Sequence, residues 1–242
     1  MPDPFPASFP RALIFDVDGT LAETEELHRR AFNDTFAAIG LDWHWDVALY
    51  KELLKTTGGK ERMRAYIADH APAQAPADSD IPDIHKRKTA RYGELMANGE
   101  IELRPGIAAL IADARATGVP VAVATTTNAP NVEALTRACW GKPAHEIFVA
   151  VAAGDMVAAK KPAPDVFLLA LEKLGLPAGD CLAFEDSRNG LLSARAAGIP
   201  TLVSPGPYTD DQDLSAAQAR VDCFSTVDSM ARLRDVLTRA PA

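Results

Sequence analysis

The stretch 15–21, F-D-V-D-G-T-L, brings together residue types that could carry out chemistry. It directly follows an apolar run, so Asp16 and Asp18 come where a short buried strand is expected to end. In extended backbone, residues two apart face the same side, so both carboxylates should share one small space. Such a pair raises one pKa or binds a cation, which suits a Mg²⁺ site or a nucleophile beside an acid/base. An ordinary turn at a strand end, where Asp and Gly are common, is the alternative.

Three more groups of polar residues stand after apolar runs or ahead of a helix. Thr125 follows V-A-V-A, and its hydroxyl and the next backbone N–H groups could hold a phosphate oxygen. Lys161 precedes a proline, which places it on a loop. Glu185 and Asp186 follow another apolar run and could bind a metal ion. Taken singly, each group has an ordinary alternative: a strand-end threonine, a solvated lysine or a helix cap.

Together these four groups supply what phosphoryl transfer requires. A carboxylate can act as the nucleophile and take the phosphoryl group as an aspartyl phosphate. It could not approach a phosphate dianion unless a metal ion and a lysine cancelled the repulsion. Positioned cations also stabilise the charge that develops on the phosphate and leaving-group oxygens.

Short apolar runs alternate with helical patterns over most of the chain. This alternation predicts an α/β fold, with a mostly parallel sheet and helices packed on it. Ligands of such sheets bind at the carboxyl ends of the strands, which is where the polar groups stand. Strands are expected at 13–15, 119–124, 147–152, 181–184 and 201–203, and helices at 106–118, 131–140, 164–175 and 188–198.

One segment, residues 25–98, interrupts the alternation. Its apolar residues recur at helical spacing, and it contains no convincing strand pattern. Helices are expected over 27–39, 47–54, 60–70 and 84–96, with a loop rich in Pro, Ala and Asp over 71–82. The predicted organisation is therefore a loose tail over 1–10, a core made of 11–24 and 99–242, and an all-helical insertion over 25–98.

Composition excludes several classes of function. The chain has 242 residues, 48% of them hydrophobic, which is enough for a sizeable core. A net charge of -8 argues against nucleic-acid binding, and no apolar run approaches the roughly 18 residues of a membrane span. Three cysteines without a C-x-x-C pattern suggest neither a zinc site nor disulfides, and predict a reducing, cytoplasmic location. The four prolines and absent basic region of residues 1–10 do not resemble a secretory signal.

From Arg11 to about Val227, this set of motifs resembles the haloacid dehalogenase superfamily of hydrolases. The resemblance implies a Rossmann-like α/β core with a helical cap inserted after the first motif. It implies that Asp16 is the nucleophile and that Asp18 is the general acid and then the base. Thr125 and Lys161 would hold the phosphoryl group.

The same resemblance implies Mg²⁺ as the cofactor. The ion would be held by Asp16, the backbone carbonyl of Asp18 and Asp186, with Glu185 close by. The true dehalogenases and the phosphonate-cleaving relatives lack the second aspartate, so Asp18 speaks against both activities. The ion-pumping relatives need membrane helices, for which the chain has no candidate run.

Four stretches resemble the CbbY-like phosphatases and the β-phosphoglucomutases that share their cap: A-E-T-E-E-L-H-R-R-A-F-N, T-T-G-G-K-E-R, V-A-T-T-T and L-R-P-G. The CbbY-like phosphatases clear xylulose 1,5-bisphosphate, an inhibitory sugar, in Calvin-cycle bacteria. The resemblance therefore implies hydrolysis of xylulose 1,5-bisphosphate to xylulose 5-phosphate, with the second phosphate held away from Asp16.

A site for that second phosphate is expected in the insertion. Residues 58–60 open a helix, whose free backbone N–H groups attract anions, and a basic cluster follows at 86–91. The ordinary alternative for such a cluster is a solvated helix face. Glu25 would accept hydrogen bonds from sugar hydroxyls. In the mutase-like relatives, a histidine at the place of His28 contacts the acid/base aspartate. The expected substrate-binding residues are Glu25, His28, Gly58, Gly59, Lys60, Arg62, His85, Lys88, Thr126 and Thr127.

Other functions fit the same core motifs. A phosphomutase of the β-phosphoglucomutase type needs the same residues, as does a phosphatase of broad specificity or one acting on phosphoglycolate. A sensor that binds sugar phosphates without turnover is a third class, although such a protein could have lost a motif residue and all four groups are present here. The expected partner is a small sugar phosphate, with no nucleic acid and no membrane, and the chain is expected to be a monomer.

Overall fold

The computed structural model describes residues 9–99 and 101–239, and over these residues the chain forms two compact units. Thr24–Ile101 form a helical unit, and the described residues before and after it form an α/β core. The sequence predicts the insertion over 25–98, within three residues of these bounds. The core is therefore built from two parts of the chain that the helical segment separates.

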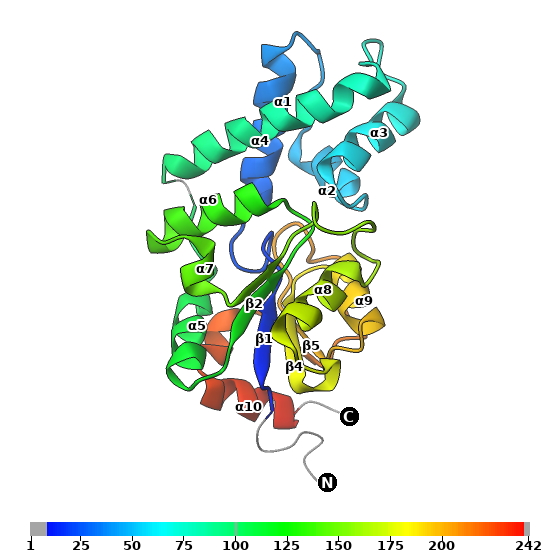
Figure 1. Cartoon of the computed structure of the whole chain (residues 1–242). Helices are drawn as coiled ribbons and strands as arrows, with labels where there is room; N and C mark the ends of the chain where they lie inside the picture. Colours follow the sequence, from blue (N-terminus) through cyan, green and yellow to red (C-terminus); the bar gives the residue numbers. More distant parts are fainter. Residues whose placement is uncertain (1–8, 100, 240–242) are drawn as a thin grey trace. The chain divides into compact units, whose positions relative to one another are not determined.

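The core is built on one six-stranded sheet (Figure 1). Its strands are β1 (Ala12–Phe15), β2 (Val121–Ala124), β3 (Ala150–Ala152), β4 (Cys181–Glu185), β5 (Thr201–Val203) and β6 (Ala219–Arg220). They lie in the order β3-β2-β1-β4-β5-β6, and every pair is parallel. The predicted α/β fold with a Rossmann-like, mostly parallel sheet is confirmed. Because all strands run the same way, their carboxyl ends lie along one edge.

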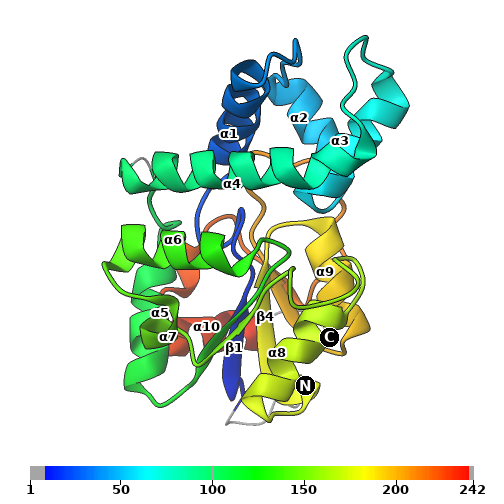
Figure 2. The same ribbon diagram turned by 45° about the horizontal axis from the view of Figure 1, so that its top comes forward.

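The central strands β1, β2 and β4 are buried on both faces, and so their residues are apolar except for Glu185, the last residue of β4. Alternate residues divide between the faces: Ala12 and Ile14 pack in one cluster with α8 (Asp165–Leu174) and α9 (Arg188–Ala196). The helices α5 (Ile107–Ala116) and α10 (Met230–Arg239) lie on the other side of the sheet (Figures 1 and 2). The small alanines of the first face allow α8 and α9 to approach the sheet closely.

Some core elements differ from the sequence-based predictions. The helix α6 (Ala129–Trp140) begins two residues early, because Pro130 lies in its first turn, where no N–H is needed. Half of the run expected as a strand over 147–152 is not strand: α7 (Ala144–Ile147) occupies its start, and β3 begins only at Ala150. Short apolar runs in buried helices and strands look alike. Neither β6 nor α10 was predicted, and neither were the 3-10 turns η2 (Ala178–Asp180) and η3 (Phe224–Val227).

The helical unit consists of α1 (Glu25–Ala38), α2 (Val47–Leu53), α3 (Gly59–His70), the 3-10 turn η1 (Asp78–Asp80) and α4 (Ile81–Ala97). Its described residues, 24–99 and 101, contain no strand, as predicted for this segment. Aromatic rings form its interior, where Phe36 packs edge-on against both Trp43 and Trp45. The loop predicted over 71–82 ends earlier, because η1 and the first turn of α4 occupy its last residues.

The chain before β1 is only partly described. Of the predicted loose tail over 1–10, residues 1–8 lie outside the described residues. Phe9 and Pro10 are buried, and the Phe9 carbonyl accepts a hydrogen bond from Arg234 Nε on α10 at 3.3 Å. For these two residues the structure differs from the prediction, because α10 covers them. Among the described helices, none combines the length and the apolar character needed to cross a membrane.

The helix α10 should be an integral part of the core, although it was not predicted. Leu233 on α10 is fully buried, whereas Arg232 beside it is exposed and pairs only with Asp228. We expect Leu233→Ala to lower the free energy of unfolding by about 2–5 kcal/mol, because it leaves a cavity. Arg232→Ala, the matched control, should change it by less than about 1 kcal/mol. Chemical denaturation measures both, and a Leu233→Ala variant as stable as the control would contradict this packing.

Candidate active site

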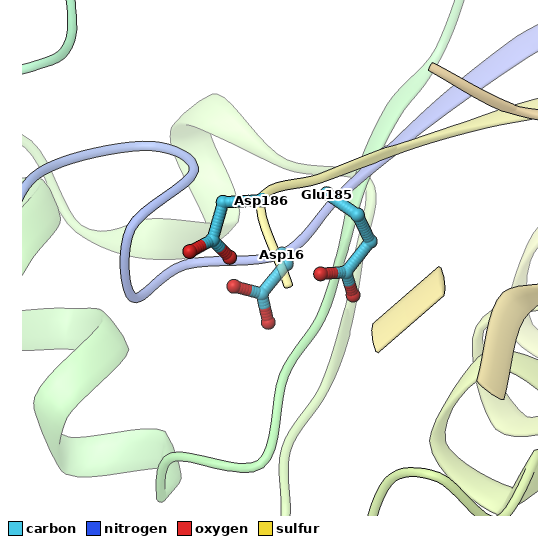
Figure 3. A group of neighbouring side chains, drawn as sticks. All are labelled: Asp16, Glu185 and Asp186. Carbon is cyan, nitrogen blue, oxygen red and sulfur yellow. The ribbon is translucent and has the colours of Figure 1, made fainter. Parts of the chain in front are cut away.

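The carboxyl ends of β1 and β4 place three acidic side chains together. Phe15 pairs with Phe184 in these neighbouring strands, and the Asp16 N–H donates to the Phe184 carbonyl at 3.0 Å. Asp16 and Glu185 therefore emerge side by side, and Asp186 follows at once. Ligand oxygens of Asp16, Glu185 and Asp186 all lie within 4.8 Å of one another, and the three residues are buried (Figure 3).

The Lys161 ammonium lies between two of these carboxylates. Its Nζ donates to Asp16 Oδ1 at 2.5 Å, to Glu185 Oε1 at 2.6 Å and to the Ala124 carbonyl at 2.9 Å. These three acceptors use all three N–H groups of the ammonium. Because Ala124 ends β2, the lysine connects the carboxyl ends of three strands, β2, β1 and β4.

Burial and charge shift the ionisation of this cluster. Desolvation raises the pKa of Asp16, and Asp18 raises it further, whereas Lys161 lowers it. Desolvation also raises the pKa of Glu185 to about 8, against the opposing effect of Lys161. Burial alone would lower the pKa of Lys161, but the two carboxylates outweigh it and raise that pKa. Burial therefore outweighs the single cation, and both acids take up protons more readily than they would in water.

The Asp186 carboxylate is enclosed by the turn after β1 and by a loop after β5. Thr20 Oγ1 donates to Asp186 Oδ1 at 3.4 Å, and Thr209 Oγ1 donates to Oδ2 at 3.1 Å. Gly19 has φ +84°, and a Cβ at this position would lie 2.3 Å from Asp186 Oδ2. Only glycine therefore fits both the backbone conformation and the close approach.

The acidic cluster fits a divalent cation such as Mg²⁺. Among the described groups, Glu185 Oε2 is a buried oxygen without a hydrogen-bond partner. Such an atom is costly unless something supplies positive charge. Three carboxylates stand against one lysine, and carboxylate oxygens are the ligands that Mg²⁺ prefers. The residues present therefore suit the ion that the sequence predicts.

The remaining predicted residues of the core follow the ends of β1 and β2: Asp18 comes after Asp16, and 125–127 come after Ala124. Asp18 is half-buried two residues after Asp16 and close enough to raise its pKa. Thr125 is fully buried, follows the carbonyl that Lys161 binds, and its Oγ1 accepts from the Thr127 N–H at 3.1 Å. Thr126 and Thr127 lie against Gly154: a Cβ on this glycine would meet the Thr126 carbonyl, and its N–H donates to the Thr127 carbonyl at 2.8 Å.

In the helical unit, a predicted lysine and histidine form a pair. Lys88 Nζ lies 2.6 Å from His28 Nδ1, and it also stands over the rings of Phe32 and Tyr92. A charged lysine can only donate, so His28 Nδ1 is the acceptor and its proton resides on Nε2. The His28 ring stacks on Tyr92 with centroids 4.0 Å apart. Aromatic faces therefore support a buried ammonium beside a neutral imidazole.

A second group in the same unit joins two further predicted residues through a tyrosine. Tyr50 Oη donates to Glu25 Oε2 at 3.0 Å and accepts from Arg62 Nη1 at 3.0 Å. Sequence reasoning missed Tyr50, which carries no motif signal and is read as an apolar position of α2. The Tyr50 hydroxyl therefore connects the Glu25 carboxylate to the Arg62 guanidinium.

The glycines at the start of α3 adjoin the basic residues. Gly58 is the residue before α3 and has φ 96°, and half-buried Lys60 follows in the first turn. A Cβ on Gly59 would lie 2.5 Å from His85 Nε2 and 3.2 Å from Phe32, so this glycine lets α3 approach α4. The predicted substrate-binding residues of the insertion therefore adjoin one another through Phe32 and Tyr50.

Sequence reasoning also missed two residues that surround the acidic cluster, Thr209 and Arg104. Arg104 is buried and donates to the Gly19 carbonyl at 2.6 Å. Its only signal in the sequence is its place in L-R-P-G, where the chain returns to the core. Thr209 lies in a polar loop without any motif and carries no such signal.

Comparison with known proteins agrees with this geometry. Residues 10–198 match the family of haloacid dehalogenase-like hydrolases. Protein CbbY of Cereibacter sphaeroides is 56% identical over 222 residues, which cover 92% of this chain and 96% of the relative. This chain belongs to the haloacid dehalogenase-like hydrolases.

Two crystal structures extend the comparison. CbbY from Rhodobacter sphaeroides in complex with phosphate has a TM-score of 0.90 at 56% identity, and the match covers 93% of this chain and 99% of that one. An aspartate-to-asparagine mutant of the same protein, in complex with xylulose-(1,5)bisphosphate, has a TM-score of 0.89 at 55% identity with the same coverage. Family membership makes the chain an enzyme, and the match to CbbY assigns it to the phosphatases of the family.

Removal of the Lys161 charge should destabilise the protein in a pH-dependent way. We expect Lys161→Met to lower the free energy of unfolding by about 3–5 kcal/mol at pH 8 in EDTA, because two buried carboxylates lose their partner. Without the lysine, the pKa values of Asp16 and Glu185 rise further above their unfolded values. The folded state then binds more protons than the unfolded state, so the stability of the variant falls as pH rises.

The loss relative to the native protein should therefore be smaller at pH 5.5 than at pH 8, as measured by denaturant titration. Lys142→Met is the matched control, because Lys142 is exposed in the same unit. A loss of equal size at both pH values would show that Lys161 acts through packing and not through its charge.

Proposed function

We propose that this chain is a Mg²⁺-dependent phosphatase that hydrolyses xylulose 1,5-bisphosphate to xylulose 5-phosphate through an aspartyl-phosphate intermediate. The observation that carries the proposal is the buried cluster of Asp16, Glu185 and Asp186 with Lys161 bridging two of its acids. The substrate is inferred from the 55%-identical CbbY mutant crystallised with that sugar bisphosphate.

Asp16 is the nucleophile in this proposal. Its Oδ1 is held by Lys161, which lowers the pKa of the carboxyl against the effect of burial and fixes its orientation. Attack on phosphorus breaks the bond to the sugar oxygen and transfers the phosphoryl group to Asp16. Asp18 first gives its proton to the leaving oxygen and then takes one from the water that hydrolyses the aspartyl phosphate.

Lys161 and Thr125 act on the phosphoryl group. The ammonium neutralises part of the charge of the approaching dianion, which would otherwise be repelled by the acids. The Thr125 hydroxyl accepts from the Thr127 N–H and can donate its own proton to a phosphoryl oxygen. Asp16, Glu185, Asp186 and the carbonyl of Asp18 would hold Mg²⁺, which supplies further positive charge to the phosphoryl oxygens when bound.

The helical unit supplies the binding groups for the rest of the substrate. Lys88 is buried against His28, and Arg62 against Tyr50, so each cation already has a fixed position. Fixed cations bind a phosphate with less loss of side-chain entropy than mobile surface lysines. With the N–H groups at the start of α3, they suit a second phosphate, and Glu25 suits sugar hydroxyls.

The remaining expectations concern the setting of the reaction. All three cysteines are free thiols, which supports the cytoplasmic location proposed from the sequence. The monomeric state stays a prediction, as does the absence of nucleic-acid and membrane partners.

The products distinguish this function from its alternatives. We expect phosphorus NMR of the enzyme with xylulose 1,5-bisphosphate and Mg²⁺ to show inorganic phosphate and xylulose 5-phosphate in equal amounts. A mutase would instead move phosphate between positions with little free phosphate. EDTA should stop the reaction, and added Mg²⁺ should restore it.

Asp16→Asn should reduce turnover by about 10⁴-fold or more, because the amide is not a nucleophile. Asp180→Asn, at a half-buried residue paired with Arg11, is the control and should retain native activity. Undiminished phosphate release by Asp16→Asn, or by the native enzyme in EDTA, would refute the proposed mechanism. Tight binding of the bisphosphate with no products would indicate a sensor.

A lysine on α4 tests the role of the helical unit. We expect Lys88→Met to raise KM for xylulose 1,5-bisphosphate about tenfold or more, because a hydrogen bond to a charged group contributes about 1.5–3 kcal/mol. Lys86→Met on the same helix removes an exposed lysine and should leave KM unchanged. Hydrolysis of p-nitrophenyl phosphate, which has no second phosphate, should be affected much less by either change. An equal rise of both KM values in Lys88→Met would mean that the lysine does not recognise the second phosphate.

A further inference from the structure

The loop that follows β5, residues 204–209, is placed beside the metal-binding acids by the register of the sheet. Glu185 at the end of β4 pairs with Val203 at the end of β5, and the Ser204 N–H donates to the Glu185 carbonyl at 3.0 Å. The loop therefore starts next to Glu185 and Asp186. None of its residues belongs to the four motif groups of the sequence.

The loop contacts Asp186 through Thr209. Thr209 Oγ1 accepts from the Gly206 N–H at 2.9 Å and lies 3.1 Å from Asp186 Oδ2. Its one proton could also go to the Gly206 carbonyl at 3.4 Å, but that carbonyl already accepts the Thr209 N–H at 3.0 Å. The carboxylate is nearer and charged, so it is the better acceptor. The hydroxyl is buried and held by its own turn, and it points at one oxygen of the acid.

Arg104 fastens the same loop to the turn after β1. Nη1 donates to the carbonyls of Gly19 at 2.6 Å and Ser204 at 2.7 Å. Nη2 donates to Ser204 Oγ at 2.9 Å and to the Pro205 carbonyl at 3.1 Å. Nε lies 3.1 Å from Glu23 Oε1.

Four N–H groups of Arg104 thus donate to protein oxygens, and Nε forms an ion pair with Glu23. These contacts commit the buried arginine to the two loops. The Gly19 carbonyl it holds belongs to the residue that touches Asp186 and follows Asp18. The guanidinium also packs over the Phe224 ring at 4.8 Å, which fixes its plane.

We propose that the loop 204–209 is a positioning element of the active site, in which Thr209 orients the Asp186 carboxylate for Mg²⁺ and Arg104 fixes the loop against the Gly19 turn. Thr20 and Thr209 hold the two oxygens of Asp186 from opposite loops, so the carboxylate keeps one orientation before the ion arrives. This inference rests on the proposed function, because it presupposes the metal site. Residues that orient a metal ligand commonly change metal affinity about 10–100-fold when they are lost.

The test is the dissociation constant of Mg²⁺ measured by calorimetry on the substrate-free protein. Thr209→Val removes the hydroxyl, and we expect it to weaken Mg²⁺ binding about tenfold. Thr209→Ser keeps the hydroxyl and should stay within about twofold of the native value. Thr226→Val is the matched control, because the Thr226 hydroxyl donates only to the Cys223 carbonyl elsewhere in the core.

Arg104→Lys tests the second part, since one ammonium cannot serve five acceptors. It should also weaken Mg²⁺ binding. The double variant Arg104→Lys/Thr209→Val should bind Mg²⁺ about as tightly as whichever single variant binds it less tightly, because both residues act through one loop. Additive losses would overturn the link between the two residues.

Native Mg²⁺ affinity in Thr209→Val, or equal losses in Thr209→Val and Thr209→Ser, would overturn the role of the hydroxyl. The unfolding temperature in EDTA shows whether valine disturbs the fold. If it does, Thr209→Ala removes the same hydroxyl without the larger side chain. A native protein that binds no Mg²⁺ would refute the proposed function itself, whereas native binding that is insensitive to Thr209 would refute only this inference.

Discussion

The active site depends on the neutralisation of buried carboxylates by Lys161. Asp16 and Glu185 are both buried at the ends of adjacent parallel strands, and burial raises the pKa of each. The Lys161 ammonium lies between them and donates a hydrogen bond to each. Two acids with a single lysine still leave negative charge, and Asp186 adds to it. This excess of buried negative charge destabilises the fold, and it also makes the cluster a site for a divalent cation and a phosphate.

The parallel sheet provides the rigidity that this arrangement requires. Lys161 reaches the ends of three strands, and the register of β1 with β4 brings Asp16 against Glu185. The loop after β5 and the turn after β1 enclose Asp186, and Arg104 joins them. In the proposed reaction Asp16 must be held in line for attack, and the strand ends around it, with Arg104 bonded to the Gly19 turn, provide that support.

The helical unit follows a different physical rule. Its cations are held by aromatic groups: Lys88 lies over Phe32 and Tyr92, and Arg62 donates to Tyr50. Aromatic faces help to fix the position of such a cation. In the core, by contrast, Lys161 is committed to two carboxylates. This difference fits the proposal that the core carries out the chemistry and the helical unit selects the substrate.

The sequence by itself determined the alternation of strands and helices, the helical insertion, and the acids and lysine at the strand ends, because periodicity and residue type are local signals. It missed α10 and read Ile147 as strand, since short apolar segments of buried helices and strands look alike. Only the tertiary structure decided that Lys161 lies between Asp16 and Glu185, that Tyr50 joins Glu25 to Arg62, and that Arg104 and Thr209 support Asp186. These contacts join residues far apart in the chain, and sheet register and helix packing, which no local pattern records, bring them together.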